Sequence, residues 1–321
     1  MGLFDIFKKK PITFETTVNS NSSYNPWDKA KGDASNDYAT ANFLHMLSSQ
    51  AAPIKTSNDS YPRYLSYDLK INDPVKKHKE LLKAGYLREA TTTEVLSTFK
   101  VPELKTLLEA HGISVKGKKT DLIDAATAID SAALKLPVMY CVSAKGLDFM
   151  AQNDDLIKLF RNPYNVTYEE YITTKNNRKI SFNNVIWEIF NRREMFAGNS
   201  YGSKRNNEYH RAKFLNAEGN FVESLRYYIH TLFFDLNDPS RIIPDWAKKD
   251  WDGSVSQISP EILENIFELR ANYIPKMAEE CYDYMEPSKI LVKKKDFARL
   301  LNDIFDAKQI DAKKYLPKGC R

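Results

Sequence analysis

Three lysines surround a glycine between two short apolar stretches of the sequence. The four residues are Lys116, Gly117, Lys118 and Lys119, and Thr120 follows them directly. A helix predicted to begin near Thr120 would direct its first backbone N–H groups toward the same place. Lysine side chains and the free amides of a helix N-terminus both bind phosphate, and a glycine lets the phosphate approach the backbone. The pattern therefore indicates a contact with the phosphate backbone of a nucleic acid.

Two short helices, joined by an extended piece, are predicted to position these lysines. Pro102 favours the start of the first helix, and Gly112 suits the left-handed residue after its end. Residues 113–116 are expected to be extended, and Thr120 is expected to cap the second helix with Asp121 in its first turn. The apolar residues expected to form the shared core are Leu104, Leu107, Leu108, Leu122, Ile123 and Ala126.

This segment, residues 95–129, resembles the SAP domain. The matching patterns are Val-x-Glu-Leu-Lys at 101–105, Gly-Ile at 112–113 and Gly-x-Lys-x-x-Leu-Ile at 117–123. The resemblance implies DNA binding through the turn and the start of the second helix, with Lys105 added to the residues from Lys116 to Thr120. Ala125 stands where the family usually has a basic residue. Residues 98–129 hold five lysines and four acids, so we expect weak binding with little sequence preference.

The whole chain has 321 residues, of which 42% are hydrophobic and 28% charged, and its pattern predicts a mainly α protein. A short β-hairpin or wing is predicted near 137–142, and Asp73-Pro74 predicts a helix that Gly85 ends. The predicted segments are a partly flexible N-terminal arm (1–60), a helical lead-in (61–94), the SAP-like unit (95–129), a connector with a short strand and helix (130–180) and an α-helical domain (181–321).

The α-helical domain shows two clear apolar helix faces, one beginning at Phe182 and one at Phe221. The segment 212–239 resembles a single tetratricopeptide hairpin with Gly219 at its turn, and no repeat period supports a solenoid. The second face is expected to pack on the first near Trp187; the residues expected to do so are Phe221, Leu225, Tyr228 and Leu232, facing Ile186, Trp187 or Phe190.

The C-terminal stretch is the most basic part of the chain. Between Ser288 and Arg321 there are ten Lys or Arg residues and four Asp residues. Lys293, Lys294, Lys295 and Arg299 could form a second phosphate-facing surface, or they could be the solvated face of a helix whose other side begins with Phe297.

Patterns typical of enzymes and metal proteins are missing from the sequence. The stretch from Gly112 to Lys119 is close to a phosphate-binding P-loop, but it lacks the Ser or Thr that holds magnesium and a helix precedes it. The five histidines have no metal-ligand spacing, and His78 and His230 are expected at helix surfaces or half-buried. The three cysteines are scattered and predict neither disulfides nor a zinc site. We therefore expect no catalytic residues, no metal and no cofactor.

Targeting signals are equally sparse. No apolar run reaches the roughly 20 residues that cross a bilayer, and the first ten residues lack the features of a secretory leader. A cytoplasmic protein is expected. Leu3, Phe4, Ile6 and Phe7 beside three lysines could rest on a membrane, although two helical turns anchor weakly and could instead tuck into the protein itself.

Two functions follow from these patterns. The first is a non-enzymatic DNA-associated protein. The sequence resembles those of uncharacterised SAP-containing proteins of Gram-positive bacteria, their phages and mobile elements. The alternative is a helical protein-interaction scaffold or virion component, in which the domain from residue 181 binds a partner and the SAP-like unit only packs.

Overall fold

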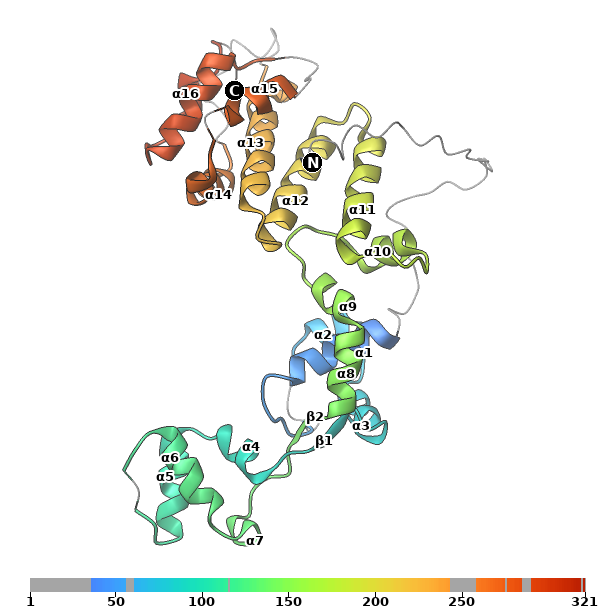
Figure 1. Ribbon diagram of the computed structural model, residues 1–321, viewed down its shortest axis with the longest axis vertical. Helices are drawn as coiled ribbons and strands as arrows, with labels where there is room; N and C mark the ends of the chain where they lie inside the picture. Colours follow the sequence, from blue (N-terminus) through green and yellow to red (C-terminus); the bar gives the residue numbers. More distant parts are fainter. Residues whose placement is uncertain are drawn as a thin grey trace, which may run out of the picture.

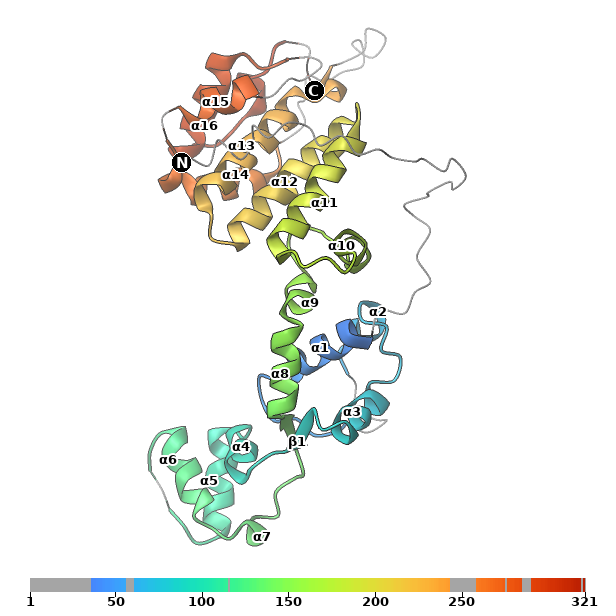
Figure 2. The same cartoon turned by 45° about the vertical axis from the view of Figure 1, so that its right-hand side comes forward.

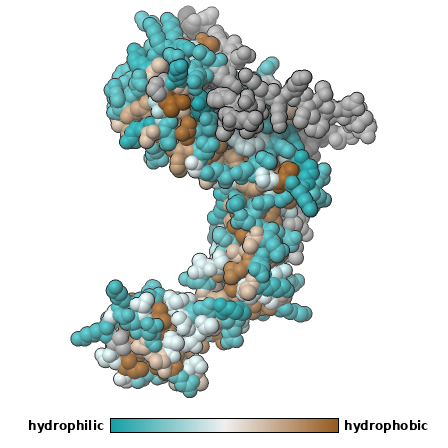
Figure 3. Space-filling model, viewed as in Figure 1, coloured by the Kyte–Doolittle hydropathy of each residue, from teal (hydrophilic) through white to brown (hydrophobic). Residues whose placement is uncertain are grey.

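The computed structural model describes residues 36–55, 61–114, 116–242, 258–274, 276–284, 290–318 and 320. The predictions for the chain before residue 36, including its apolar first segment, lie outside these residues. The described part is mainly helical, as predicted, and it is elongated and curved. Residues 91–136 form a lobe at one end of a crescent, and the C-terminal helices form the other end (Figures 1 and 3).

A core that runs from the middle of the crescent up to α11 (Phe182–Ala197), beside α12 (Tyr201–Ala217), brings the predicted lead-in and connector together. It contains α1 (Asn36–Leu47), α2 (Tyr64–Tyr67), α3 (Pro74–Lys83), β1 (Leu87–Glu89), β2 (Tyr140–Val142), α8 (Ala144–Gln152), α9 (Asp154–Leu159), α10 (Tyr168–Lys175) and α11 (Phe182–Ala197). The predicted start of α3 is confirmed, because the Asp73 side chain accepts a hydrogen bond from the Lys76 amide and Pro74 is the first helical residue. Gly85 ends the helix with a φ of +76°.

The strand predicted near residue 140 is confirmed, but its partner is not local. β2 pairs antiparallel with β1, which lies far earlier in the chain, and Glu89 is opposite Tyr140. The short β element predicted near 137–142 is therefore present as β2, with a partner strand that the sequence analysis did not name. The Ser143 hydroxyl fixes the exit of β2 by donating to the Gly85 carbonyl oxygen, 2.7 Å away. The two strands form a stem from which the intervening residues project.

The lobe carried by this stem contains four short helices. They are α4 (Thr92–Ser97), α5 (Val101–Ala110), α6 (Lys119–Thr127) and α7 (Ser131–Leu134). Figures 1 and 2 show this lobe beyond β1 and β2, at the end of the molecule opposite the C-terminal helices. The SAP-like segment is thus inserted between two paired strands.

The C-terminal part begins with a long helical hairpin, α12 (Tyr201–Ala217) and α13 (Phe221–Asn237). Gly219 makes its turn with a φ of +74°, and the buried Ser224 hydroxyl donates to the Ala212 carbonyl oxygen across the hairpin. The remaining elements are η2 (Pro239–Arg241), α14 (Pro260–Glu268), η4 (Leu269–Asn272), α15 (Met277–Tyr284), α16 (Lys294–Phe305) and η5 (Ala312–Lys314).

The predicted contact between the faces of α11 and α13 is wrong in most of its residues. Ile186 and Phe190 of α11 belong to the middle core, whereas Leu225 and Tyr228 of α13 belong to a separate C-terminal core with α14, α15 and α16. Phe221 is exposed. Two helix faces of the same period can each find a different partner, and here α12 packs between them.

Both helical histidines are more buried than expected. The His78 ring is enclosed in the middle core, where its Nδ1 lies 3.0 Å from the Tyr61 hydroxyl. His230 lies inside the C-terminal hairpin, with Nδ1 2.8 Å from a carboxylate oxygen of buried Glu208. The other Glu208 oxygen pairs with Arg211 at 2.7 Å, so a charged partner compensates the burial of each group.

Candidate nucleic-acid interface

The predicted helix–extension–helix arrangement is confirmed. Leu104 and Leu108 of α5 are fully buried against Leu122 and Ala126 of α6, and Leu107 and Ile123 are half-buried at the edge of this core. Gly112 has the expected left-handed conformation, with a φ of +73°. The next residue folds back, since the Ile113 amide donates to the Leu108 carbonyl oxygen. The turn between α5 and α6 is therefore held at both ends by packing.

A helix that the sequence analysis did not predict completes this core. α4 contributes Leu96, which is fully buried with Leu104 and Leu108. Its start is a capping box: the Glu94 amide donates to the Thr91 hydroxyl, and the Glu94 carboxylate accepts from the Thr91 amide. The Thr-x-x-Glu spacing from Thr91 to Glu94 is the signal that could have found this helix.

α4 also fastens the lobe to the stem. Arg88 of β1 donates two hydrogen bonds to the Glu94 carboxylate, at 2.7 and 2.8 Å. This guanidinium, followed by the Thr91 amide, lowers the pKa of Glu94 to about 2. A small apolar cluster of Ala51, Val95 and Met139 also joins α4 to the residue that precedes β2. The position of the lobe on the stem is thus fixed by both polar and apolar contacts.

The predicted turn residues, Lys116 to Thr120, are all exposed in the structure. However, α6 begins at Lys119, so Lys118 is the residue before the helix and Thr120 lies within its first turn. The prediction that Thr120 caps the helix is wrong. The Asp121 carboxylate supplies a hydrogen bond at this end instead, accepting from the Lys118 amide at 2.8 Å. The Lys118 amide is therefore already bonded within the fold.

Gly117 is required by this cap. Its φ is not in the left-handed region, but a Cβ added to it would lie 2.2 Å from Asp121 Oδ2. Any larger residue would push the carboxylate away from the Lys118 amide. The glycine thus allows the close passage of the chain over Asp121.

The lysines of the turn are not equivalent. The Lys119 ammonium donates to the Ser97 carbonyl oxygen at 2.6 Å, which ties α6 to the end of α4. Lys116 and Lys118 form no side-chain hydrogen bond or ion pair with the described residues, and the same holds for Lys105 on the exposed side of α5. Lys116 and Lys118 are therefore the cations of the turn that are available to an external anion.

Ala125 departs from the family pattern for a reason visible in the packing. It is half-buried and lies against the core of the lobe, beside Leu122 and Ala126. It contributes apolar contact and no charge. Among the residues predicted to bind phosphate, the cations are therefore those of the turn and Lys105.

The second basic surface is partly used within the fold. Lys294 pairs with Asp283 of α15 at 2.7 Å. Arg299 pairs with Asp296 at 3.3 Å and donates to the carbonyl oxygen of Lys314. A shallow pocket lies between α15 and α16; its lining residues are Ala278, Glu279, Lys294, Lys295 and Ala298.

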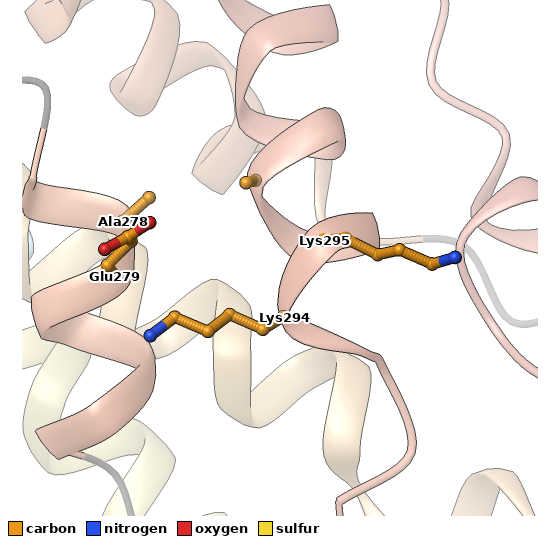
Figure 4. A pocket seen from close by; sticks show the side chains of 5 residues that line it. Ala278, Glu279, Lys294 and Lys295 are labelled. Carbon is orange, nitrogen blue, oxygen red and sulfur yellow. The ribbon is translucent and has the colours of Figure 1, made fainter.

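Figure 4 shows how the cations of this pocket diverge. Lys294 reaches toward α15, and Lys295 extends to the other side of α16. Lys293 and Lys295 are exposed and have no ion pair with the described residues. The predicted group of four cations is thus divided between internal ion pairs and solvent.

Comparison with known protein families gives a match within this lobe. Residues 95–128 match the SAP domain family. The lobe is therefore a SAP domain, which is a class of domain that suggests nucleic-acid binding. Curated proteins and solved structures give no match to the chain.

Two features are absent from the described residues. No helix among them is both long and apolar enough to cross a membrane. Nor do they contain a group of three or more His, Cys, Asp or Glu residues placed to hold a metal ion.

Proposed function

We propose that this is a non-enzymatic, DNA-associated protein that holds the DNA backbone through its SAP domain. The observation that carries the proposal is the pair of exposed, unpaired cations, Lys116 and Lys118, at the start of α6. The Lys119 and Thr120 amides belong to the first turn of α6, where helix N–H groups are left without a partner in the helix. Cations and amides together suit a phosphate and carry no base specificity.

The internal bond of Lys119 sets the expected strength. Lys116 and Lys118 can neutralise two phosphates, so log affinity should fall with log salt at a slope of about −1.8 on duplex DNA. If Lys105 reaches a third phosphate, the slope steepens to about −2.7. This is weak, backbone-directed binding with little sequence preference.

The test compares variants of the full chain on duplex DNA over a range of salt concentrations. K116E/K118E should weaken binding and flatten the salt slope without loss of stability, because both side chains are exposed. The matched control is K179E/K276E, which makes the same change of charge at two exposed lysines outside the lobe. Equal affinity of both variants for DNA would refute the role of the turn. In that case Lys293 and Lys295 are the next residues to change.

The setting that we propose is the DNA of a phage or mobile element in a bacterial cytoplasm. This setting is supported by the resemblance of the sequence to those of SAP-containing proteins of Gram-positive bacteria and their phages. Isolation of the native protein with and without nuclease treatment tests it, since a DNA-dependent association disappears with the DNA.

A second candidate function is a protein-interaction scaffold or virion component. The observation that favours it is the exposure of Met195 (82%) and Phe196 (81%) near the end of α11. Two adjacent large apolar side chains in water are typical of a binding surface. A stoichiometric protein complex that survives high salt and is lost in M195S/F196S would support this function; its persistence in that variant would remove the support.

A further inference from the structure

One face of α3 carries a row of lysines that the fold does not use. Lys76, Lys79 and Lys83 are spaced three and four residues apart, so they lie on one side of the helix. All three are exposed. The opposite side of α3 packs into the middle core through His78 and Leu81.

This row costs stability within the helix. Like charges three or four residues apart on a helix repel each other, and Lys76 lies in the first turn, where the helix dipole disfavours a cation. Glu80 is spaced to pair with Lys76 or Lys83, but no ion pair forms among the described residues.

Elsewhere in the described chain, lysines are often compensated. Lys158, Lys175, Lys213, Lys294 and Lys308 each pair with a carboxylate at 2.6–2.9 Å. The predicted basic surface of the C-terminal helix includes one of these pairs. The lysines of the α3 row are exposed and unpaired, as are Lys116 and Lys118 of the SAP domain and scattered lysines such as Lys179. What marks the row is that three such lysines lie on one helix face.

We propose that the exposed face of α3, with Lys76, Lys79 and Lys83, is a second contact for the phosphate backbone of DNA. This inference rests on the proposed function and adds a binding surface outside the SAP domain. The row spans about 10 Å along the helix axis, a length that covers about three phosphates of one DNA strand.

The position of α3 decides how the two surfaces combine. α3 leads through Gly85 into β1, and β1 leads into the SAP domain, so the stem joins the two surfaces. In Figures 1 and 2, α3 and the α5–α6 pair lie on opposite sides of the stem. The two surfaces therefore add phosphate contacts along a long duplex without forming one groove.

The experiment measures affinity against salt for the full chain on a duplex of about 30 base pairs. The test variant is K76E/K79E/K83E. Its control, K179E/R192E/K276E, makes the same change of charge at three scattered, exposed and unpaired cations. We expect the test variant to bind at least about tenfold more weakly at low salt, with a slope less steep by up to about 2.7, and the control to change by less than about twofold.

Equal loss in the test variant and the control overturns the inference. K76Q/K79Q/K83Q guards against misfolding, because it removes the charges without repulsion and should flatten the slope in the same way. A loss in the α3 variant with none in K116E/K118E supports α3 while refuting the SAP turn. The reverse result refutes α3 alone, and a wild type without affinity for DNA refutes both.

Discussion

At the turn before α6, a glycine and an aspartate depend on each other. A Cβ at Gly117 would occupy the place of the Asp121 carboxylate, which caps α6 through the Lys118 amide. We predict that Gly117→Ala displaces this carboxylate and destabilises the SAP domain by about 1 kcal/mol, the usual cost of a lost cap. Hydrogen exchange of the α6 amides in the full chain measures the loss.

The double variant separates this cause from a general intolerance of alanine. Asp121→Ala should cost a similar amount, and G117A/D121A should cost little more than either change alone, because the second change removes the clash. Additive losses would show that Gly117 and Asp121 act independently.

His230 predicts a dependence of stability on pH. Burial alone would lower its pKa, but hydrogen bonds to Cys281 and Glu208 outweigh burial and raise the pKa to about 9. The unfolded chain has a histidine pKa of about 6.5. The stabilisation is therefore complete below pH 6.5 and is lost as pH rises through 9.

Urea unfolding of the wild type and of His230→Gln, measured between pH 6 and pH 10, tests the sign. The difference in the free energy of unfolding between the two proteins should shrink as pH rises. A difference that stays constant over this range would mean that His230 is neutral in the folded protein.

Single residues were the hardest part to predict from the sequence. The match to the SAP pattern predicted which lysines are exposed. It did not predict which of them form hydrogen bonds within the fold. The bond from Lys119 to Ser97 needs α4 to pack beside α6. The spacing of Thr91 and Glu94 marks the start of α4, but no local pattern gives its contact with α6. The burial of His230 needs Glu208 on the neighbouring helix, and a pairing between helices leaves no spacing signal in the sequence.

At the scale of elements, the small core of the SAP domain makes each apolar contact important. Leu108 of α5 is fully buried in a cluster with only a few other buried side chains. We predict that Leu108→Ala lowers the opening free energy of α5 by about 2–5 kcal/mol, measured by hydrogen exchange. Leu107→Ala is the matched control, since the half-buried Leu107 should cost less. Equal losses for both would place the core elsewhere.

Helices were predicted well where an apolar face and end signals agree. The faces of α11, α13 and α16 follow the helical period, and α3 has both its Asp-Pro start and its glycine end. Periodicity identifies a buried face but does not identify its partner, so the contact predicted between α11 and α13 was wrong in most of its residues. The pairing of β1 with β2 was missed for a related reason, because three-residue strands carry too few side chains to show a period.

At the scale of the whole molecule, the stem predicts that the SAP domain can be removed. The Ala90 amide donates to the Met139 carbonyl oxygen just beyond the paired strands. Replacing residues 91–138 by Asn-Gly should therefore close a tight hairpin. We predict that the remaining chain unfolds cooperatively, measured by circular dichroism on heating, and loses the SAP-dependent part of its DNA affinity. A molten remainder would show that α4 and its neighbours belong to the middle core.

The antiparallel stem also has a mechanical consequence. β1 leads from the middle core to the SAP domain, and β2 leads back to the middle core. A pull on DNA held by the SAP domain therefore stretches both strands from the same end. The tension is shared by two covalent chains, and it neither slides the strands past each other nor peels them apart. The hydrogen bonds between Leu87–Glu89 and Tyr140–Val142 therefore carry little of the force. It passes instead into the body through α3 and α8, which adjoin the two strands, and yielding under tension should begin there.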